Sequence, residues 1–362
     1  MKIESLEAGL YRIPLPETLT DATHGEMRDF DLVTVRLRDD DGVEGLGYTY
    51  AHRGGGAILS LIEREIWELL EGEDPRLRER HWERMWWGMH YFGRGGPVTF
   101  AISAVDIALW DMAARRAGEP LWRYLGGHNP NVPCYAGGID LLFTLDALLE
   151  QTQKNLEKGF RAIKMKVGRP RLSEDLERVA KMRQTLGPDF PLMVDANMRW
   201  RVDEAIRASR ALAEHDVYWL EEPTIPDDVA GHVEIVRQGA LPVAAGENLH
   251  SLYEFKNYIH AGAVSFPEPD CSNCGGVTGY LKIAHLAEAH NLPVTTHGIH
   301  DIHVHLLAAV PNSSYLEVHG FGLEPYMANP LRIEHGEALA PDRPGHGVEL
   351  DWKALEAHRG AP

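Results

Sequence analysis

Ile163-Lys164-Met165-Lys166-Val167 is a short apolar run that carries two lysines, and it opens a pattern that continues to Glu317. After it, further short apolar runs each lead to one charged residue or histidine, in steps of about 20 to 30 residues. The positions that follow these runs are Asp195, Glu221, Glu247, Asp270, His297 and Glu317. One strand, one helix and two short loops consume that length, so the spacing predicts a (β/α)8 barrel.

The strands of such a barrel are parallel, and residues at their carboxyl ends meet at one mouth. For each carboxylate alone, capping of the following helix is the simpler explanation. It explains the set less well, because caps need no apolar run before them and lysines cannot accept hydrogen bonds from a helix N-terminus. Lys164 and Lys166 also share one face of their strand, where buried cations require anions nearby.

Three carboxylates, Asp195, Glu221 and Glu247, fall on three consecutive predicted strands. Their mutual repulsion requires a cation, and an all-oxygen ligand set suits Mg²⁺ or another hard divalent ion better than zinc. The sequence therefore predicts a metal site that leaves positions open for a substrate carboxylate.

Two proton-transfer groups are expected beside this ion. Lys164 and the metal would lower the pKa of Lys166 towards that of a useful base. Asp270 lies one strand before His297 and would orient its imidazole and make it more basic. Together these groups suit removal of a proton α to a carboxylate, which requires that the resulting enediolate be stabilised as it forms.

Three further residues have expected roles near the same centre. A protonated Glu317 or Lys164 would donate a hydrogen bond to the enediolate. Asn197, two residues beyond Asp195, either orients the metal or substrate or stabilises a turn.

The portion before the repeating pattern, residues 1–125, reads as α+β. Strand patterns at 32–37 and 43–50 flank an Asp-Asp-Asp-Gly turn, and helical spacing recurs at 58–69 and 101–117. Two segments lack periodicity: 17–30, which contains His24 and Arg28, and 51–56, which contains His52 and Arg53. We expect both segments to be loops. Within 126–329, helical patterns cover 145–156, 173–187, 203–215 and 277–290.

Composition limits the class of protein. The chain of 362 residues has a formal net charge of −18, which argues against nucleic-acid or anionic-membrane partners. Neither an apolar signal core nor an apolar run of membrane-spanning length is apparent, so we expect a cytoplasmic protein. Three cysteines, Cys134, Cys271 and Cys274, form no disulfide framework. Although the last two make a CxxC, no second pair follows, and buried packing is the better interpretation.

In these motifs the chain resembles the enolase superfamily, and specifically its mandelate racemase subgroup. The motifs are Lys164-Met-Lys166, Val194-Asp195-Ala-Asn197, Leu220-Glu221-Glu-Pro, Ala245-Gly-Glu247-Asn, Asp270 with Gly275-Gly276, His297, Glu317 and Arg343-Pro-Gly-His-Gly-Val-Glu-Leu-Asp. The resemblance implies a (β/α)7β barrel at 126–329, with Glu317 ending the eighth strand. A capping domain would form from 1–125 and about 330–362.

By the same resemblance, Asp195, Glu221 and Glu247 bind one Mg²⁺ per subunit, and Lys166 faces the His297-Asp270 dyad across the substrate. Cap residues His24, His52 and Arg53 would select the substrate. We expect a homo-oligomer. We also expect it to dehydrate an acid sugar to a 2-keto-3-deoxy acid, because the 17–30 and 51–56 segments offer many hydrogen-bonding side chains and few large apolar ones. Their charges favour an aldarate.

Three alternatives remain open at this point. The same constellation serves a racemase or epimerase of 2-hydroxy acids. A barrel enzyme with a phosphate-bearing substrate would need a glycine-rich phosphate site near strands seven and eight, which His297-Gly-Ile-His-Asp does not resemble. A non-catalytic sugar-acid binding protein would not need two lysines and a His-Asp dyad around three carboxylates.

Overall fold

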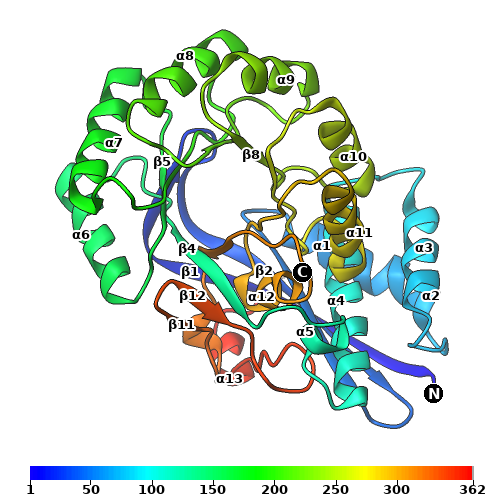
Figure 1. Cartoon of the computed structure of the whole chain (residues 1–362). Coiled ribbons are helices and arrows are strands. Elements are labelled where there is room, and N and C mark those ends of the chain that lie inside the picture. The colour runs from blue at the N-terminus through cyan, green and yellow to red at the C-terminus, as the bar shows by residue number, and fades with distance from the viewer. Residues whose placement is uncertain (361–362) are drawn as a thin grey trace.

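The computed structural model describes residues 1–360 and closes the repeating units into a barrel (Figure 1). The barrel strands are β4 Asn131–Gly137, β5 Ile163–Lys166, β6 Leu192–Asp195, β7 Leu220–Glu221, β8 Val243–Ala245, β9 Phe266–Pro267 and β10 Leu316–His319. The surrounding helices are α6 Leu145–Glu157, α7 Leu172–Leu186, α8 Val202–Ala213, α9 Val229–Gln238, α10 Leu252–Ala261, α11 Gly276–Ala289 and α12 His300–Leu307. The expected (β/α)7β barrel is confirmed.

Closure of the ring occurs where β10 pairs with β4 in parallel, with Glu317 opposite Tyr135. The seventh strand position is the least regular. There Val294 makes a single bridge to Ser313, and the Thr295 N–H donates to the Pro267 carbonyl at 2.9 Å. Glu317 is the second residue of β10 and not its end, because pairing with β4 continues to His319.

The apolar residues that alternate with the charged ones pack between the barrel strands and the surrounding helices. Met165, Val194 and Leu220 are fully buried, and burial of each such side chain contributes about 1.5–3 kcal/mol. Alternation along each strand then turns the charged residues to the inside of the barrel. This packing holds Lys164 and Lys166 in the interior at fixed positions.

The N-terminal portion forms an antiparallel sheet with helices on one side (Figure 1). Its elements are β1 Ile3–Asp21, β2 Gly25–Asp39, β3 Glu44–Ala51, α1 Gly55–Leu61, a π-helical turn at Ile62–Ile66, α2 Trp67–Leu70, α3 Arg78–Met89, α4 Pro97–Ala117 and α5 Leu121–Tyr124. The loop predicted at 17–30 was wrong. Most of it belongs to a long β1–β2 hairpin whose tip is 22–24, and a register shift between Pro14 and Leu19 breaks the alternation.

Helix α4 is long and apolar enough to cross a membrane by composition, contrary to expectation, but 78% of that stretch is buried inside the fold. It packs closely on β3 at two glycines. A Cβ at Gly45 or Gly47 would lie 2.1 or 2.0 Å from the carbonyl oxygens of Ala108 and Ala104. Glycine at these positions therefore lets the sheet and α4 form the compact body that carries the hairpin.

The chain after β10 returns to both parts of the molecule. It contains a 3₁₀ turn at Glu324–Tyr326, β11 Arg332–Glu334, β12 Glu337–Leu339 and α13 Trp352–Glu356. β12 pairs antiparallel with β4, and the Arg12 N–H donates to the His358 carbonyl at 2.8 Å. Figure 1 shows these C-terminal elements beside β1 and β4.

Candidate active site

Three carboxylates converge at the mouth of the barrel. Asp195 and Glu221 end β6 and β7, and Glu247 follows β8 by two residues. One oxygen of each lies within 4.8 Å of the others. Gly246 lets the chain before Glu247 pass close to the backbone of Glu268, because a Cβ there would lie 2.5 Å from the Glu268 carbonyl oxygen. The structure thus brings together the trio that the spacing predicted.

Both lysines of β5 are buried against this trio. The Lys164 ammonium contacts Glu221 and lies 2.8 Å from Glu317, and the Lys166 ammonium contacts Asp195. Burial lowers the pKa of Lys166, but the Asp195 carboxylate outweighs it and holds the pKa above the usual value. The direction is opposite to the one expected from the sequence, because the Lys166 ammonium pairs directly with Asp195.

The charge of this cluster is unbalanced. Asp195, Glu221, Glu247 and Glu317 face two ammonium groups and the His297 ring, so the carboxylates outnumber the cationic groups around them. Burial raises the pKa of Glu221 to about 8, partly offset by Lys164. A divalent cation would balance this excess.

Two oxygens at the mouth also lack hydrogen bonds. Among residues 1–360, Glu247 Oε2 and Asn197 Oδ1 are buried and accept none. The Asn197 N–H donates to Asp195 Oδ1 at 2.8 Å, which fixes that loop beside the trio. Carboxylate and amide oxygens are ligands that Mg²⁺ prefers, so these residues fit a hard divalent ion.

His297 and Asp270 form the predicted dyad, with Nδ1 of the imidazole 3.2 Å from Asp270 Oδ2. The other ring nitrogen, Nε2, lies 3.4 Å from Glu247 Oε2. Burial lowers the pKa of His297, but Glu247 and Asp270 outweigh it and raise the pKa to about 9. These carboxylates therefore favour the protonated imidazole, which can donate a proton.

Glu317 lies below the mouth, and its ionisation does not fit one of the roles expected for it. Burial raises its pKa, but the Lys164 ammonium outweighs this and holds the pKa below its usual value. Its Oε2 accepts the Gly298 N–H at 3.1 Å. Glu317 is therefore an ionised partner of Lys164 and not a protonated donor.

A cavity of about 220 Å³ opens above these groups, between the barrel mouth and the N-terminal sheet. Lys166, Asn197, Glu247, Asp270 and His297 line it. Lys164 and Glu317 lie beneath the lining. The cavity is large enough for a small organic acid.

The cap contributes His24 and His52 to the cavity wall. His24 Nδ1 lies 2.8 Å from Asp21 Oδ2, and this contact raises the pKa of His24. Arg53 does not line the cavity. Its guanidinium pairs with Asp29 at 2.7 Å and its side chain is 58% exposed, so the structure does not bring it to the site.

The cavity wall contains more large apolar side chains than were expected from the sequence. Met27, Phe100, Ile139 and Phe321 line the cavity beside the histidines, so the wall has apolar patches that the sequence did not predict, although most of its side chains can form hydrogen bonds. Within residues 1–360, no arginine lines it. Together with the Arg53–Asp29 pair, this removes the reason to favour a substrate with two carboxylates.

Sequence reasoning also missed polar residues at the site, among them two histidines and a glutamate. His319 and His250 line the cavity, and Glu222, beside Glu221, is buried and accepts from Asn248 Nδ2 at 2.8 Å. Burial raises the pKa of Glu222 well above its usual value. Side chains two residues apart in a strand share one face, so the position of Glu317 could have identified His319. His250 lies in a loop, and no such pattern indicates it.

The cysteines are structural. Cys134, Cys271 and Cys274 are buried and free, as expected for small apolar packing residues. Cys271 lies near Asp270 and His303 in a group that could hold a metal. However, the Cys271 N–H donates to His303 Nε2 at 2.8 Å, which occupies the nitrogen that a metal would need.

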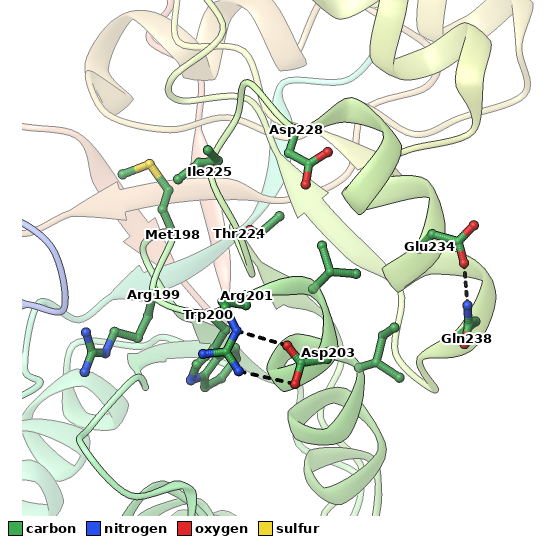
Figure 2. Close-up of a pocket in the computed structure, with 12 residues that line it drawn as sticks. Met198, Arg199, Trp200, Arg201, Asp203, Thr224, Ile225, Asp228, Glu234 and Gln238 are labelled. Carbon is green, nitrogen blue, oxygen red and sulfur yellow. Dashed lines mark hydrogen bonds and ion pairs between the residues drawn. The ribbon is translucent and has the colours of Figure 1, made fainter.

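A wider groove of about 720 Å³ lies outside the mouth, along the loops after β6 and β7 and helices α8 and α9 (Figure 2). Arg201 pairs there with Asp203, and the Gln238 amide donates to the Glu234 carboxylate. The groove contains none of the trio and neither proton-transfer group. We therefore place the active site in the smaller cavity.

Comparisons with known proteins agree with this geometry. The family model "Mandelate racemase / muconate lactonizing enzyme, N-terminal domain" matches residues 13–126, and "Enolase C-terminal domain-like" matches 147–354. A "racemase" from Streptomyces coelicolor, solved with bound magnesium, superposes with a TM-score of 0.97 at 54% identity, over 99% of this chain and 100% of that one.

Two curated relatives are also similar along nearly the whole chain. The 3,6-anhydro-alpha-L-galactonate cycloisomerase of Streptomyces coelicolor is 56% identical over 98% of both chains. The L-talarate/galactarate dehydratase of Salmonella typhimurium is 36% identical over 98% of this chain and 90% of its own.

Proposed function

The chain belongs to the mandelate racemase/muconate lactonizing enzyme family of the enolase superfamily, and from that premise we propose that it opens the ring of a 3,6-anhydro aldonate. The reaction is a β-elimination next to a carboxylate. Its product is a 2-keto-3-deoxy acid that is an isomer of the substrate.

Asp195, Glu221 and Glu247 would hold one Mg²⁺, supported by the unbalanced charge of this cluster and by the magnesium bound in the similar Streptomyces structure. The ion, when bound, supplies stabilisation of the negative charge that develops on the substrate carboxylate. With Asp195 engaged as a ligand, Lys166 would lose its ion pair with that carboxylate and would become a better base.

The chain's own residues then move the protons. Lys166 takes the proton from C2, and Lys164 stabilises the growing negative charge from below the mouth. The C2–H electron pair forms the C2=C3 bond as the C3–O bond breaks. His297, oriented by Asp270 at 3.2 Å, gives its proton to the departing oxygen. The enol then tautomerises to the ketone.

The leaving oxygen decides whether this chemistry is an isomerisation or a dehydration. In a 3,6-anhydro ring the departing oxygen remains attached to C6 and becomes a hydroxyl, so no water is lost. In an open-chain sugar acid the same oxygen leaves as water. One arrangement of Lys166 and His297 therefore serves both reactions.

The cavity wall is the observation that favours the cyclic monocarboxylate. It combines apolar Met27, Ile139 and Phe321 with histidines, and no arginine among the described residues lines it. A compact anhydro ring has apolar faces and few hydroxyls, whereas an open-chain aldarate has several hydroxyls and a second carboxylate that must each find a partner. The 56% identical cycloisomerase points to the same substrate.

Dehydration of an open-chain sugar acid is the second candidate. It is supported by the histidines of the wall, His24 and His52, and by the 36% identical dehydratase. Racemisation without elimination would use the same lysine and histidine but no acid at C3.

A substrate panel tests the proposal. The protein with Mg²⁺ is incubated separately with 3,6-anhydro-L-galactonate, galactarate, galactonate and mandelate, and 2-keto acid and optical rotation are followed. We expect keto product mainly from the anhydro acid. Keto product only from the open-chain acids would establish the dehydratase instead, and racemised mandelate without keto product from any sugar acid would overturn both.

A further inference from the structure

His319 ends β10 on the inside of the barrel mouth, two residues beyond Glu317 and therefore on the same face of the strand. Its ring meets that of His297 edge to face, with 4.9 Å between ring centroids. It also packs against Phe321 with 4.7 Å between centroids and lines the substrate cavity. His319 therefore lies beside the group to which we assign proton donation.

The protonation of this ring is set by its contacts. Its Nδ1 accepts the Phe321 N–H at 3.1 Å, so that nitrogen carries a lone pair and the proton of the neutral ring is on Nε2. Burial holds the pKa of His319 down to about 3, in spite of nearby Glu317. His319 is thus a neutral imidazole with a fixed N–H donor.

That donor has no partner within the protein. Across residues 1–360, His319 Nε2 makes no hydrogen bond, and the ring is 9% exposed where it lines the cavity. The Nε2–H is therefore open to the cavity. A ligand oxygen there could accept it.

We propose that His319 is a further catalytic residue, whose Nε2–H donates a hydrogen bond to the oxygen that leaves C3. The role rests on the proposed β-elimination and deepens it. His297 supplies the proton, and His319 holds the departing oxygen in line with that proton and stabilises the charge it gains as the C3–O bond breaks. His319 keeps its own proton throughout, so the proton balance of the reaction is unchanged.

This role separates His319 from the residues that act at C2. Proton removal by Lys166 precedes or accompanies departure of the oxygen and does not use His319. Loss of the donor should therefore slow elimination while α-proton exchange continues. A histidine that only shapes the cavity would affect both steps together.

The experiment compares His319→Leu with His319→Gln in D₂O, with Mg²⁺ and 3,6-anhydro-L-galactonate. Gln places an amide N–H near the position of Nε2, and Leu does not. For each protein, proton NMR gives the rate of 2-keto acid formation and the rate at which the C2 hydrogen of unreacted substrate is replaced by deuterium. Circular dichroism and Mg²⁺ titration check the fold, and His319→Ala serves if the Leu variant does not fold.

We expect elimination by His319→Leu to fall roughly 10² to 10³-fold, the loss typical of one oxyanion donor, while deuterium accumulates at C2 of the remaining substrate. His319→Gln should retain most of the activity. Elimination at the wild-type rate in the Leu variant, or parallel loss of exchange and elimination in a folded variant, would overturn the role of His319 and leave the proposed function intact. Absence of keto product from any sugar acid with the wild-type protein would overturn both.

Discussion

Replacing Asp270 by Asn removes one negative charge beside His297 and preserves the size of the side chain. The carboxylate lies 3.2 Å from His297 Nδ1 and helps to raise the pKa of that imidazole to about 9. Loss of an opposite charge at this distance lowers a pKa by about 1–3 units, which corresponds to about 1.4–4 kcal/mol. We therefore expect His297 in D270N to titrate between about 6 and 8.

The sign of the accompanying stability change follows from the raised pKa. Protonated His297 is favoured by the folded state, so its contribution to stability is fully present below about pH 6.5, the ordinary histidine value. It is lost as the pH rises through about 9. In D270N the contribution is smaller and is lost at lower pH.

The assay is an NMR titration of the imidazole Cε1–H signals in metal-free protein, with His297→Asn used to assign the His297 resonance. Asp29→Asn is the matched control, because Asp29 pairs with Arg53 outside the cavity. It removes the same charge without contacting His297. An unchanged His297 pKa in D270N, or an equal fall in both variants, would refute the dyad as the cause of the raised pKa.

Three further predictions concern the metal, the base and the cap. Glu247→Gln should weaken Mg²⁺ binding by more than about tenfold, because the site loses one ligand charge; isothermal titration measures this, and wild-type affinity would exclude Glu247 as a ligand. Lys166→Met should lower elimination by about 10² to 10⁴-fold and abolish exchange of the C2 hydrogen in D₂O, whereas persistent exchange would assign its removal to another base. Arg53→Ala should leave kcat/KM within about twofold, since an exposed ion pair contributes about 0–1 kcal/mol, and a large rise in KM would show that Arg53 reaches the substrate.

The barrel and most of its chemical groups could be predicted from sequence because both follow from short-range patterns. Each apolar run must be buried as a strand, and the charged residue after it must then lie at the mouth. Asp195, Glu221 and Glu247 met there as the one-per-unit spacing predicted. The same reasoning paired His297 with Asp270.

The features that could not be predicted from the sequence depend on the partner that each side chain contacts in the folded protein. The 17–30 segment showed no periodicity because a register shift interrupts its strand, and its hairpin is fixed by the Thr23 hydroxyl, which donates to the Asn197 carbonyl. Arg53 was expected at the site but pairs with Asp29. A protonated Glu317 was one of two donors expected for the enediolate, but the Lys164 ammonium holds the pKa of Glu317 below its usual value. These outcomes depend on long-range contacts that no local pattern records.

The most direct measurement of the central claim is a proton NMR time course of 3,6-anhydro-L-galactonate with the wild-type protein in D₂O, with Mg²⁺ and again after exhaustive EDTA treatment. With Mg²⁺ we expect the C2–H signal to disappear as a 2-keto-3-deoxy acid forms with deuterium at C3 and a free C6 hydroxyl, and without metal we expect no reaction. Unchanged substrate in the presence of Mg²⁺, or equal turnover after EDTA, would contradict the account.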